Sequence, residues 1–261
     1  YYVLSDPMFF RDSACRDRVA ELYRVLDEKV TLIDAVKTGF ENEMIARISS
    51  VIDPAKIDVI ISNHAEPDHS GGIPALHKLA PNAKIYCAAG AGVKDLTAYY
   101  GDLGYTGVRA GETLSLGKRT LTFVPTPMVH WPDNMVSFMA PDGILFSNDA
   151  FGQHYATFER LDTECDLPEA FVQARKYYAN IVQPYGMQTG KALAAVAGLP
   201  IAAIYPSHGI CWTKHIPEIL ALYKAWSAGE QEDTAAVVYD TMWHSTEAMA
   251  HAIENAFLAC G

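Results

Sequence analysis

The chain has 261 residues, of which half are hydrophobic and a fifth are charged, so it has enough apolar material for a substantial core. Its formal net charge of −11 argues against a nucleic-acid partner, because the sequence offers no basic stripe to neutralise phosphates. The five cysteines are scattered and include no C-x-x-C pair, which favours a reducing cytoplasm over a disulfide framework. No signal peptide or apolar run of membrane-spanning length is visible, so we expect no membrane partner.

The predicted elements begin with a strand over Tyr1–Leu4 and a hairpin with the arms Ala20–Leu26 and Val30–Val36, although residues 13–26 are alternatively helical. Helical spacing predicts helices over Phe40–Val51, Gly71–Leu79, Gly92–Tyr100, Leu167–Val182, Gln188–Ala197 and Ile216–Ala228. Apolar runs predict strands over Asp58–Ser62, Lys84–Ala89, Val108–Ala110, Leu121–Pro125, Met135–Ala140, Ile144–Asn148 and Ala202–Tyr205. Strands interleaved with helices in this way indicate an α/β sandwich with helices on its outer faces.

Potential metal ligands are concentrated directly after the strand that ends at Ser62. Two imidazoles and two carboxylates fall within six residues, namely His64, Glu66, Asp68 and His69. Pro67 disfavours the α region at the preceding residue, so we expect His64 and Glu66 to be extended and to point the same way. A solvated polar loop is the alternative, but such a loop does not need this density of ligands. The segment therefore predicts a metal site.

Three further candidate ligands lie downstream, and each follows an apolar strand: His130, Asp149 and His208. Each has an ordinary explanation, because His130 could be a packed or capping histidine, Asp149 an Asx-turn residue, and His208 part of a turn. The joint pattern favours function, since all seven residues occupy strand-end positions, where α/β proteins place their functional groups.

The ligand types indicate which metal is bound. Seven nitrogen and oxygen ligands without a thiolate suit non-haem iron or manganese, with zinc as a further possibility. A catalytic site for a single zinc ion uses three protein ligands. Seven ligands therefore imply two metal ions that share a bridging carboxylate.

The pattern His64-x-Glu66-x-Asp68-His69, followed by His130, Asp149 and His208, resembles the flavodiiron proteins of the metallo-β-lactamase superfamily. The resemblance implies an αβ/βα metallo-β-lactamase-like sandwich in which His64, Glu66 and His130 bind one iron ion. Asp68, His69 and His208 would bind the other, and Asp149 would bridge them, so that Asp149 and Glu66 serve catalysis as iron ligands. The histidine at the position of His69 is an inconstant ligand in this family. Hydrolases of the superfamily carry histidine where this chain has Glu66. Residues 5–25 depart from the family pattern.

The C-terminal part of the sequence is organised differently. Residues 1–228 are expected to form the diiron domain, residues 229–234 a polar linker, and residues 235–261 the first βα unit of an incomplete flavodoxin-like domain. That unit has a predicted strand (Ala235–Tyr239), a polar turn and a predicted helix (Thr246–Ala259). A helix N-terminus with hydroxyl donors suits a phosphate, although an ordinary N-cap at Ser245 is the alternative. By resemblance, FMN would contact Thr241, Met242, Trp243, His244, Ser245 and Thr246. We expect a chain of this length to bind iron but little FMN.

The resemblance implies a reductase that converts O₂ to water, NO to N₂O, or both, with electrons delivered through FMN. Rubredoxin or an NADH-linked rubredoxin reductase would be the electron donor, and the protein would form a head-to-tail homodimer or a dimer of dimers. Trp131 and Tyr155 are candidates for pocket walls or for ordinary core packing. The alternatives are a dizinc hydrolase of the same fold and a non-catalytic interaction module. A lost ligand would favour the non-catalytic module, and none of the seven ligands is lost.

Overall fold

The structure, a computed structural model, describes residues 28–230 and 234–260. The predicted strand over Tyr1–Leu4 and the first hairpin arm, Ala20–Leu26, lie outside these residues. The chain divides into two units, residues 1–228 and residues 229–261. Within the described ranges, no helix is both long enough and apolar enough to cross a lipid bilayer.

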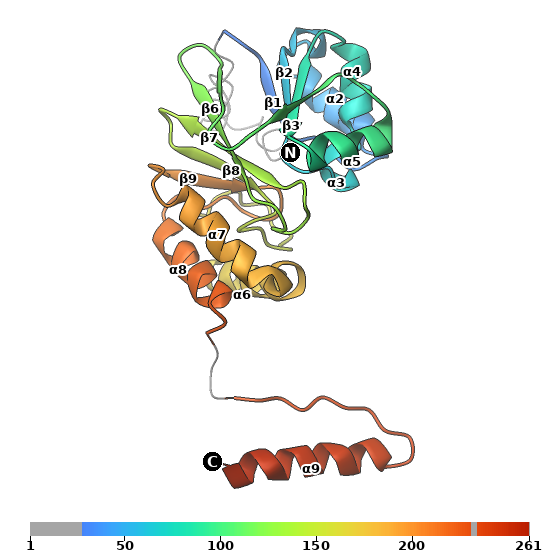
Figure 1. The fold of residues 1–261 in the computed structure, drawn as a ribbon, viewed down its shortest axis with the longest axis vertical. Helices are drawn as coiled ribbons and strands as arrows, with labels where there is room; N and C mark the ends of the chain where they lie inside the picture. The colour runs from blue at the N-terminus through green and yellow to red at the C-terminus, as the bar shows by residue number, and fades with distance from the viewer. Residues whose placement is uncertain (1–27, 231–233, 261) are drawn as a thin grey trace. The chain divides into compact units, whose positions relative to one another are not determined.

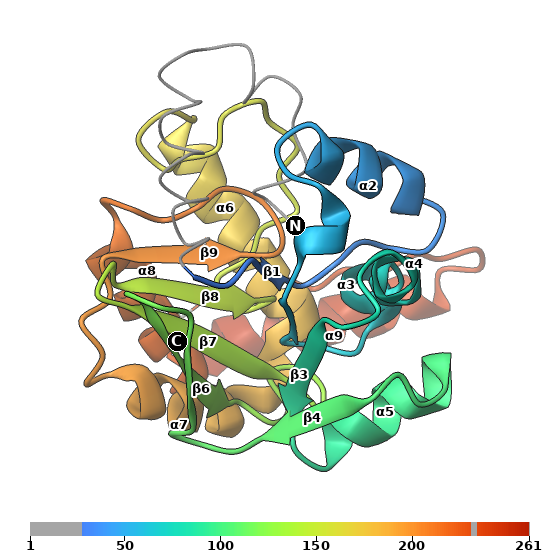
Figure 2. The same cartoon turned by 90° about the horizontal axis from the view of Figure 1, so that it is seen from above.

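The first unit is built on two sheets (Figures 1 and 2). One sheet is entirely parallel and has the order β1 (Thr31–Ile33), β2 (Val59–Ser62), β3 (Lys84–Ala88), β4 (Tyr105–Val108). The other has the order β5 (Thr113–Ser115), β6 (Thr120–Pro125), β7 (Met135–Ala140), β8 (Ile144–Asn148), β9 (Ala203–Pro206). Its strands pair antiparallel except for β9, which runs parallel to β8. Parallel neighbours end at the same edge of a sheet, which brings residues that follow β8 and β9 together.

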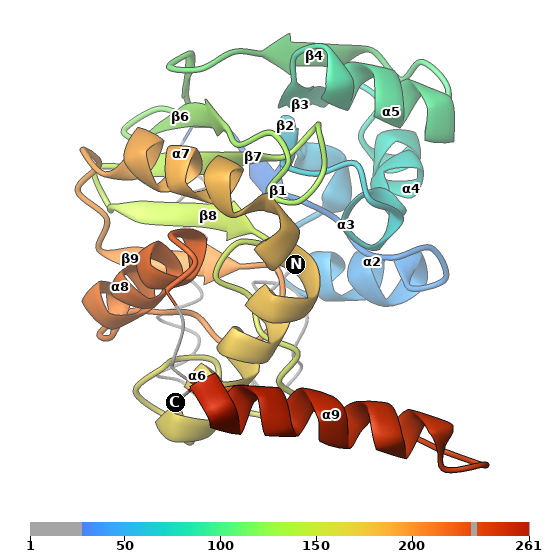
Figure 3. The same cartoon turned by 60° about the horizontal axis from the view of Figure 1, so that its bottom comes forward.

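Helices cover the outer face of each sheet (Figures 1 and 3). Beside the first sheet lie α2 (Glu41–Ser49), a 3₁₀ turn (Pro54–Lys56), α3 (Pro67–Ser70), α4 (Ile73–Leu79) and α5 (Ala91–Tyr100). Beside the second lie α6 (Leu167–Tyr177), a π turn (Tyr178–Val182), a 3₁₀ turn (Gln183–Tyr185), α7 (Gly186–Val196) and α8 (Ile216–Ser227). Pro54, Pro168 and Pro217 stand in the first turns of their helices, where a missing N–H costs nothing.

The first unit has four layers: helices, the first sheet, the second sheet, and helices. The alternation of side chains along β2 explains how the first three layers are held together. Ile60 packs into a buried cluster with residues of α2, α4 and α5. Its neighbours Val59 and Ile61 point the other way, into a cluster with Leu121 and Phe123 of the facing sheet. A third cluster joins the outer face of the second sheet to α6 and α8. Apolar contacts thus hold helices on sheet, sheet on sheet, and sheet on helices, which confirms the predicted αβ/βα sandwich.

Most predicted elements are present within two or three residues of their expected bounds, and three differ. The strand predicted at Val108–Ala110 lies earlier, as β4, because the residues before Val108 pair with β3. The arm Val30–Val36 contributes only three residues, which pair parallel with β2. The helix predicted over Leu167–Val182 loses its α geometry after Tyr177. Neither α3, the single turn ahead of α4, nor the short strand β5 was predicted from the sequence.

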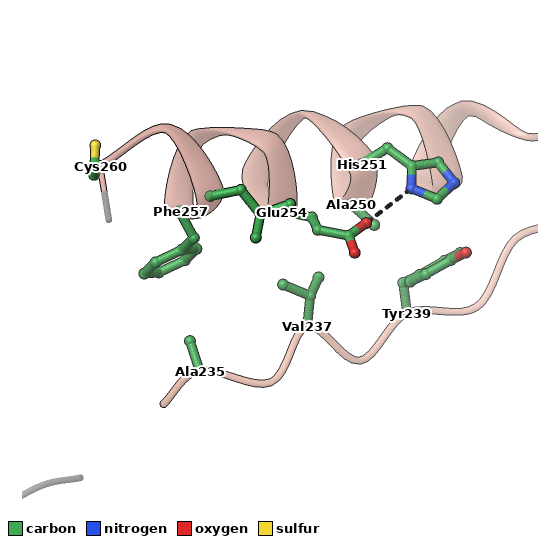
Figure 4. Close-up of a pocket in the computed structure, with 9 residues that line it drawn as sticks. Ala235, Val237, Tyr239, Ala250, His251, Glu254, Phe257 and Cys260 are labelled. Atoms are coloured by element: carbon green, nitrogen blue, oxygen red, sulfur yellow. Dashed lines mark hydrogen bonds and ion pairs between the residues drawn. The ribbon is translucent and has the colours of Figure 1, made fainter. Parts of the chain in front are cut away.

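The second unit consists of an extended segment and helix α9 (Ser245–Cys260), which agrees with the predicted helix (Figure 4). Residues 235–239 are not a β-strand, contrary to the prediction, since no strand in the described part of the chain pairs with them. A groove of about 680 Å³ separates this segment from α9 and is lined by Val237, Tyr239, Ala250 and Phe257, among others. Most of the α9 side chains are exposed, so this unit has little core of its own.

Candidate metal centre

Four of the seven candidate ligands come from the turn between β2 and α4. His64 follows β2 by two residues, and Glu66 is extended (φ −55°, ψ 137°), as Pro67 requires. Asp68 and His69 lie on α3. The turn contains Gly71 at a point where there is no room for a side chain. A Cβ there would lie 2.6 Å from the Pro67 carbonyl oxygen and 2.5 Å from the Thr38 backbone nitrogen. A side chain at position 71 would therefore push these backbone segments apart and move the turn that carries the four candidate ligands.

The other three candidates are carried by loops that follow strands of the second sheet. His130 comes after β6, Asp149 directly after β8, and His208 two residues after β9. Gln153 joins the last two loops, because its amide donates to the Phe151 carbonyl (2.6 Å) and its oxygen accepts from the Ile210 N–H (2.6 Å). The backbone N–H of Gln153 also donates to the His208 carbonyl (3.0 Å). These contacts hold the Asp149 loop against the His208 loop.

One group of donor atoms contains His64, Glu66, His130 and Asp149. The Glu66 Oε2 atom lies 3.2 Å from His64 Nε2 and 3.3 Å from His130 Nε2. The Asp149 Oδ2 atom lies 3.6 Å from His64 Nε2 and 3.4 Å from His130 Nε2. The four atoms therefore form a closed ring around one point.

A second group contains Asp68, His69 and His208. Asp68 Oδ2 lies 3.3 Å from His69 Nε2 and 3.5 Å from His208 Nε2. The other carboxylate oxygen of Asp149, Oδ1, completes this ring at 3.1 Å from His69 Nε2 and 3.2 Å from His208 Nε2. The structure thus brings all seven predicted residues together, and Asp149 turns one oxygen toward each group.

The residues fit a pair of metal ions. Ligand atoms bonded to one ion at about 2.1 Å are separated by roughly 3.0–3.4 Å, depending on coordination geometry, and the ring distances are of this size. Within the described part of the chain, His69 Nε2 and Asp149 Oδ2 are buried and have no hydrogen-bond partner, which is unusual for buried polar atoms. A cation within each ring would satisfy these atoms.

The electrostatics of the site also favour bound cations. Burial lowers the pKa of His64, but hydrogen bonds to Asp133 and Glu66 outweigh it and raise the pKa to about 10. Burial likewise opposes the shift at His130, whose pKa is raised to about 9 by Asp149 and Glu66. Burial would raise the pKa of Asp149, yet the surrounding histidines hold it well below its usual range. The carboxylates thus attract positive charge, which metal ions supply when they displace protons from the histidines.

Three buried side chains around the rings were not identified from the sequence. Asp133 lies 2.9 Å from His64 Nδ1 and accepts the Ala65 N–H. Tyr177 donates a hydrogen bond to Asp149 Oδ1 (3.1 Å). Asp34 accepts from the backbone and side-chain N–H groups of Asn63 (2.7 and 3.2 Å). Asp133 stands in the conspicuous stretch His130-Trp-Pro-Asp-Asn, but nothing in one sequence tells an orienting carboxylate from a turn residue.

The remaining candidates lie elsewhere or have other contacts. Trp131 is half-buried, and its ring stands edge-on to that of His64, with centroids 5.1 Å apart, so it forms one wall of the site. Tyr155 packs against the cluster beneath the second sheet. The predicted FMN contacts occupy the exposed turn before α9 and its first residues, and they stay a prediction. The groove in Figure 4 is lined by none of them.

Replacing Gln153 by alanine should lower the free energy of unfolding by about 1–3 kcal/mol, because the buried Ile210 N–H loses its acceptor and the Phe151 carbonyl keeps only the Trp212 indole N–H as a donor. Urea unfolding of the two proteins measures this difference. Gln173, a half-buried residue of α6 whose amide donates only to the Glu169 side chain among the described side-chain contacts, is the matched control, and its alanine variant should cost less than about 1 kcal/mol. Equal losses in both variants would show that the Gln153 contacts do not hold the two loops.

Comparisons with known proteins agree with this geometry. The sequence model of the ODP family beta lactamase matches residues 20–209. The chain is 41% identical over 253 residues to the nitric oxide reductase of Moorella thermoacetica, covering 95% of this chain and 63% of that protein. It is also 41% identical over 236 residues to the anaerobic nitric oxide reductase flavorubredoxin of Citrobacter koseri, covering 88% of this chain and 49% of the relative.

Among solved structures, the rubredoxin oxygen:oxidoreductase of Desulfovibrio gigas superposes with a TM-score of 0.83 at 40% identity. The superposition covers 89% of this chain and 59% of that one. The flavodiiron protein of Giardia intestinalis gives a TM-score of 0.80 at 36% identity, with 85% and 55% covered. The chain thus spans less than two thirds of the length of these relatives.

Proposed function

Because the chain belongs to the ODP family of β-lactamase-like proteins, in its flavodiiron branch, we propose that it is the diiron part of an oxidoreductase that reduces NO, O₂ or both. The observation that carries this proposal is the division of Asp149 between two rings of donor atoms. His64, Glu66 and His130 would hold one iron ion, and Asp68, His69 and His208 the other. Asp149 would bridge them. The products would be N₂O from NO and water from O₂.

The candidate ligands on one side of the site are buried, and those on the other side are partly exposed. The side chains of His64, His69 and Asp149 are at most 2% exposed, whereas those of Glu66 and Asp68 are 31% and 36% exposed. When bound, the two iron ions supply the redox equivalents and the open coordination positions at which a diatomic gas is reduced. The buried side chains would shield the carboxylate of Asp149 from bulk water, and small gases and protons would enter from the partly exposed side at Glu66 and Asp68.

Electron delivery is proposed from the likeness to longer relatives. Proteins named flavorubredoxin and rubredoxin oxygen:oxidoreductase match this chain, which supports rubredoxin or an NADH-linked rubredoxin reductase as the donor. We assign residues 1–228 to the diiron domain, residues 229–234 to a linker, and residues 235–261 to the start of a flavodoxin-like domain. The turn over residues 241–246 would hold the FMN phosphate. A head-to-tail homodimer, alone or paired into a dimer of dimers, would bring the flavin of one subunit to the iron site of the other.

A gas-consumption assay tests the proposed reaction. The iron-loaded chain is reduced without air by an artificial electron donor and then given NO or O₂, with an electrode following the loss of each gas. We expect consumption of at least one gas to scale with iron content and to vanish in the Asp149→Asn variant. Consumption of neither gas by a chain with both irons bound would contradict the proposal. A chain purified with two zinc ions and hydrolytic activity would instead support the dizinc hydrolase.

Exchanging Glu66 for histidine should shift metal preference from iron toward zinc, because the change removes one negative charge and adds an imidazole nitrogen. Cells supplied with equal iron and zinc would be used, and the purified variants analysed for both metals. The zinc-to-iron ratio should rise several-fold relative to the native chain. Glu112, an exposed residue in the turn before β5, is the control, and its histidine variant should keep the native ratio. An unchanged ratio in Glu66→His would remove Glu66 from the ligand set.

A further inference from the structure

The two rings of donor atoms are matched in ligand type. Each contains two histidine Nε2 atoms, one carboxylate oxygen of its own, and one oxygen of Asp149. The carboxylate is Glu66 in one ring and Asp68 in the other, so the formal ligand charges are also equal. Ligand type and formal charge therefore give no reason for the two positions to differ in affinity, which directs attention to the groups outside the rings.

The outer contacts of the histidines differ between the rings. His64 Nδ1 lies 2.9 Å from the carboxylate of Asp133, which is 1% exposed and also accepts the Ala65 N–H. This contact places the proton on Nδ1, fixes the ring, and leaves the Nε2 lone pair for a metal ion. In the second ring, the corresponding Nδ1 atom of His69 is buried and has no hydrogen-bond partner among the residues that the structure describes. The nearby Asp34 carboxylate is hydrogen-bonded to Asn63 and Asn148 instead.

The shared carboxylate is asymmetric as well. Its Oδ2 atom, which faces His64 and His130, is buried and accepts no hydrogen bond from the described residues. Its Oδ1 atom, which faces His69 and His208, accepts one from the Tyr177 hydroxyl at 3.1 Å. A hydrogen bond withdraws electron density from the oxygen that receives it, so Oδ1 is the weaker metal donor of the two.

We propose that the two positions are unequal, and that the ring with His64, Glu66 and His130 holds its ion more tightly than the ring with Asp68, His69 and His208. This proposal rests on the proposed function, which requires a pair of iron ions, and adds that the two ions are bound with different affinities. Outer partners of a ligating histidine typically change metal affinity by 10–100-fold. A chain with one ion therefore carries it beside Asp133, and the ion beside His69 is the exchangeable one.

A chelator series on the iron-loaded chain tests this order. Crystals of the chain are equilibrated anaerobically with increasing concentrations of an iron chelator, and anomalous diffraction at the iron edge gives the occupancy of each position. The position at His69 should lose half of its iron at a chelator concentration at least about 10-fold below that for the position at His64. Parallel loss, or earlier loss from the His64 position, would overturn the proposed order. A chain that never holds iron in either position would overturn the proposed function itself.

Variants of Asp133 identify the cause of the order. Asp133→Ala should reduce the ratio between the chelator concentrations at which the two positions lose half of their iron by about 10–100-fold. The reduction should come chiefly from weaker iron binding at the His64 position. Asp133→Asn keeps an oxygen that can accept a hydrogen bond from His64 Nδ1, so part of the native gap between the two chelator concentrations should remain. A general loss of stability in the Asp133 variants would not produce this difference between alanine and asparagine. The control is Asp162→Ala, which removes a buried carboxylate that accepts the N–H groups of Lys214 and His215 before α8. A gap that stays at its native size in both Asp133 variants would overturn the assignment.

Discussion

Replacing Asp149 by alanine should release both iron ions and lower gas turnover by at least about 100-fold, a larger loss than removal of any one terminal histidine. Asp149 is the only one of the seven candidate ligands that offers an oxygen to each ring. Its loss therefore opens both rings, whereas loss of His130 or His208 opens one. Iron analysis of the purified variants, together with the gas electrode, measures both effects.

Two controls make the Asp149 result specific. Asp142→Ala removes an exposed carboxylate that pairs with Arg119, and it should leave iron content and turnover unchanged. His208→Ala should lose iron mainly from the ring that contains Asp68. If Asp149→Ala retains two irons and full turnover, Asp149 is not the bridge.

Asp34→Ala should be among the most destabilising substitutions in the first unit, with an expected loss of about 3–5 kcal/mol in the free energy of unfolding. The Asp34 carboxylate, 4% exposed, accepts hydrogen bonds from Asn63 after β2 and from Asn148 at the end of β8. It therefore ties the two sheets together at the edge where the metal ligands stand. Alanine would leave three buried N–H groups without an acceptor. Urea unfolding monitored by circular dichroism gives the difference.

Two further substitutions separate the effect of losing the buried hydrogen bonds from the effect of losing a carboxylate charge. Asp34→Asn keeps one acceptor oxygen and should lose less stability than Asp34→Ala. Asp58→Ala removes an exposed carboxylate that accepts only the Val30 N–H among the described side-chain contacts, and it should cost less than about 1 kcal/mol. A loss below 1 kcal/mol in Asp34→Ala would mean that the buried network does not join the sheets.

The sequence carried enough information to predict the sandwich and the grouping of the seven residues. Apolar runs such as the one ending at Ser62 are strands buried on both faces, and strand ends are where ligands such as Asp149 can gather. The short-range effect of Pro67 on Glu66 was also predictable, because it depends only on neighbouring residues.

Features that depend on long-range contacts were not predictable in the same way. Asp133 and His64 are 69 positions apart, and Tyr177 and Asp149 are 28 apart, so no local pattern reveals either pair. The position of β4 depends on which residues pair with β3 rather than on their apolar pattern. Residues 235–239 have the composition of a strand, but a strand also needs a neighbour with which to pair.

We expect Asp149 to bridge two iron ions that the six other candidate ligands hold. A crystal of the iron-loaded chain, measured with X-rays just above and just below the iron absorption edge, tests it most directly. Two iron peaks should appear, one within each ring of donor atoms, with a different oxygen of Asp149 bound to each. A single peak, or two peaks that Asp149 does not join, would contradict it.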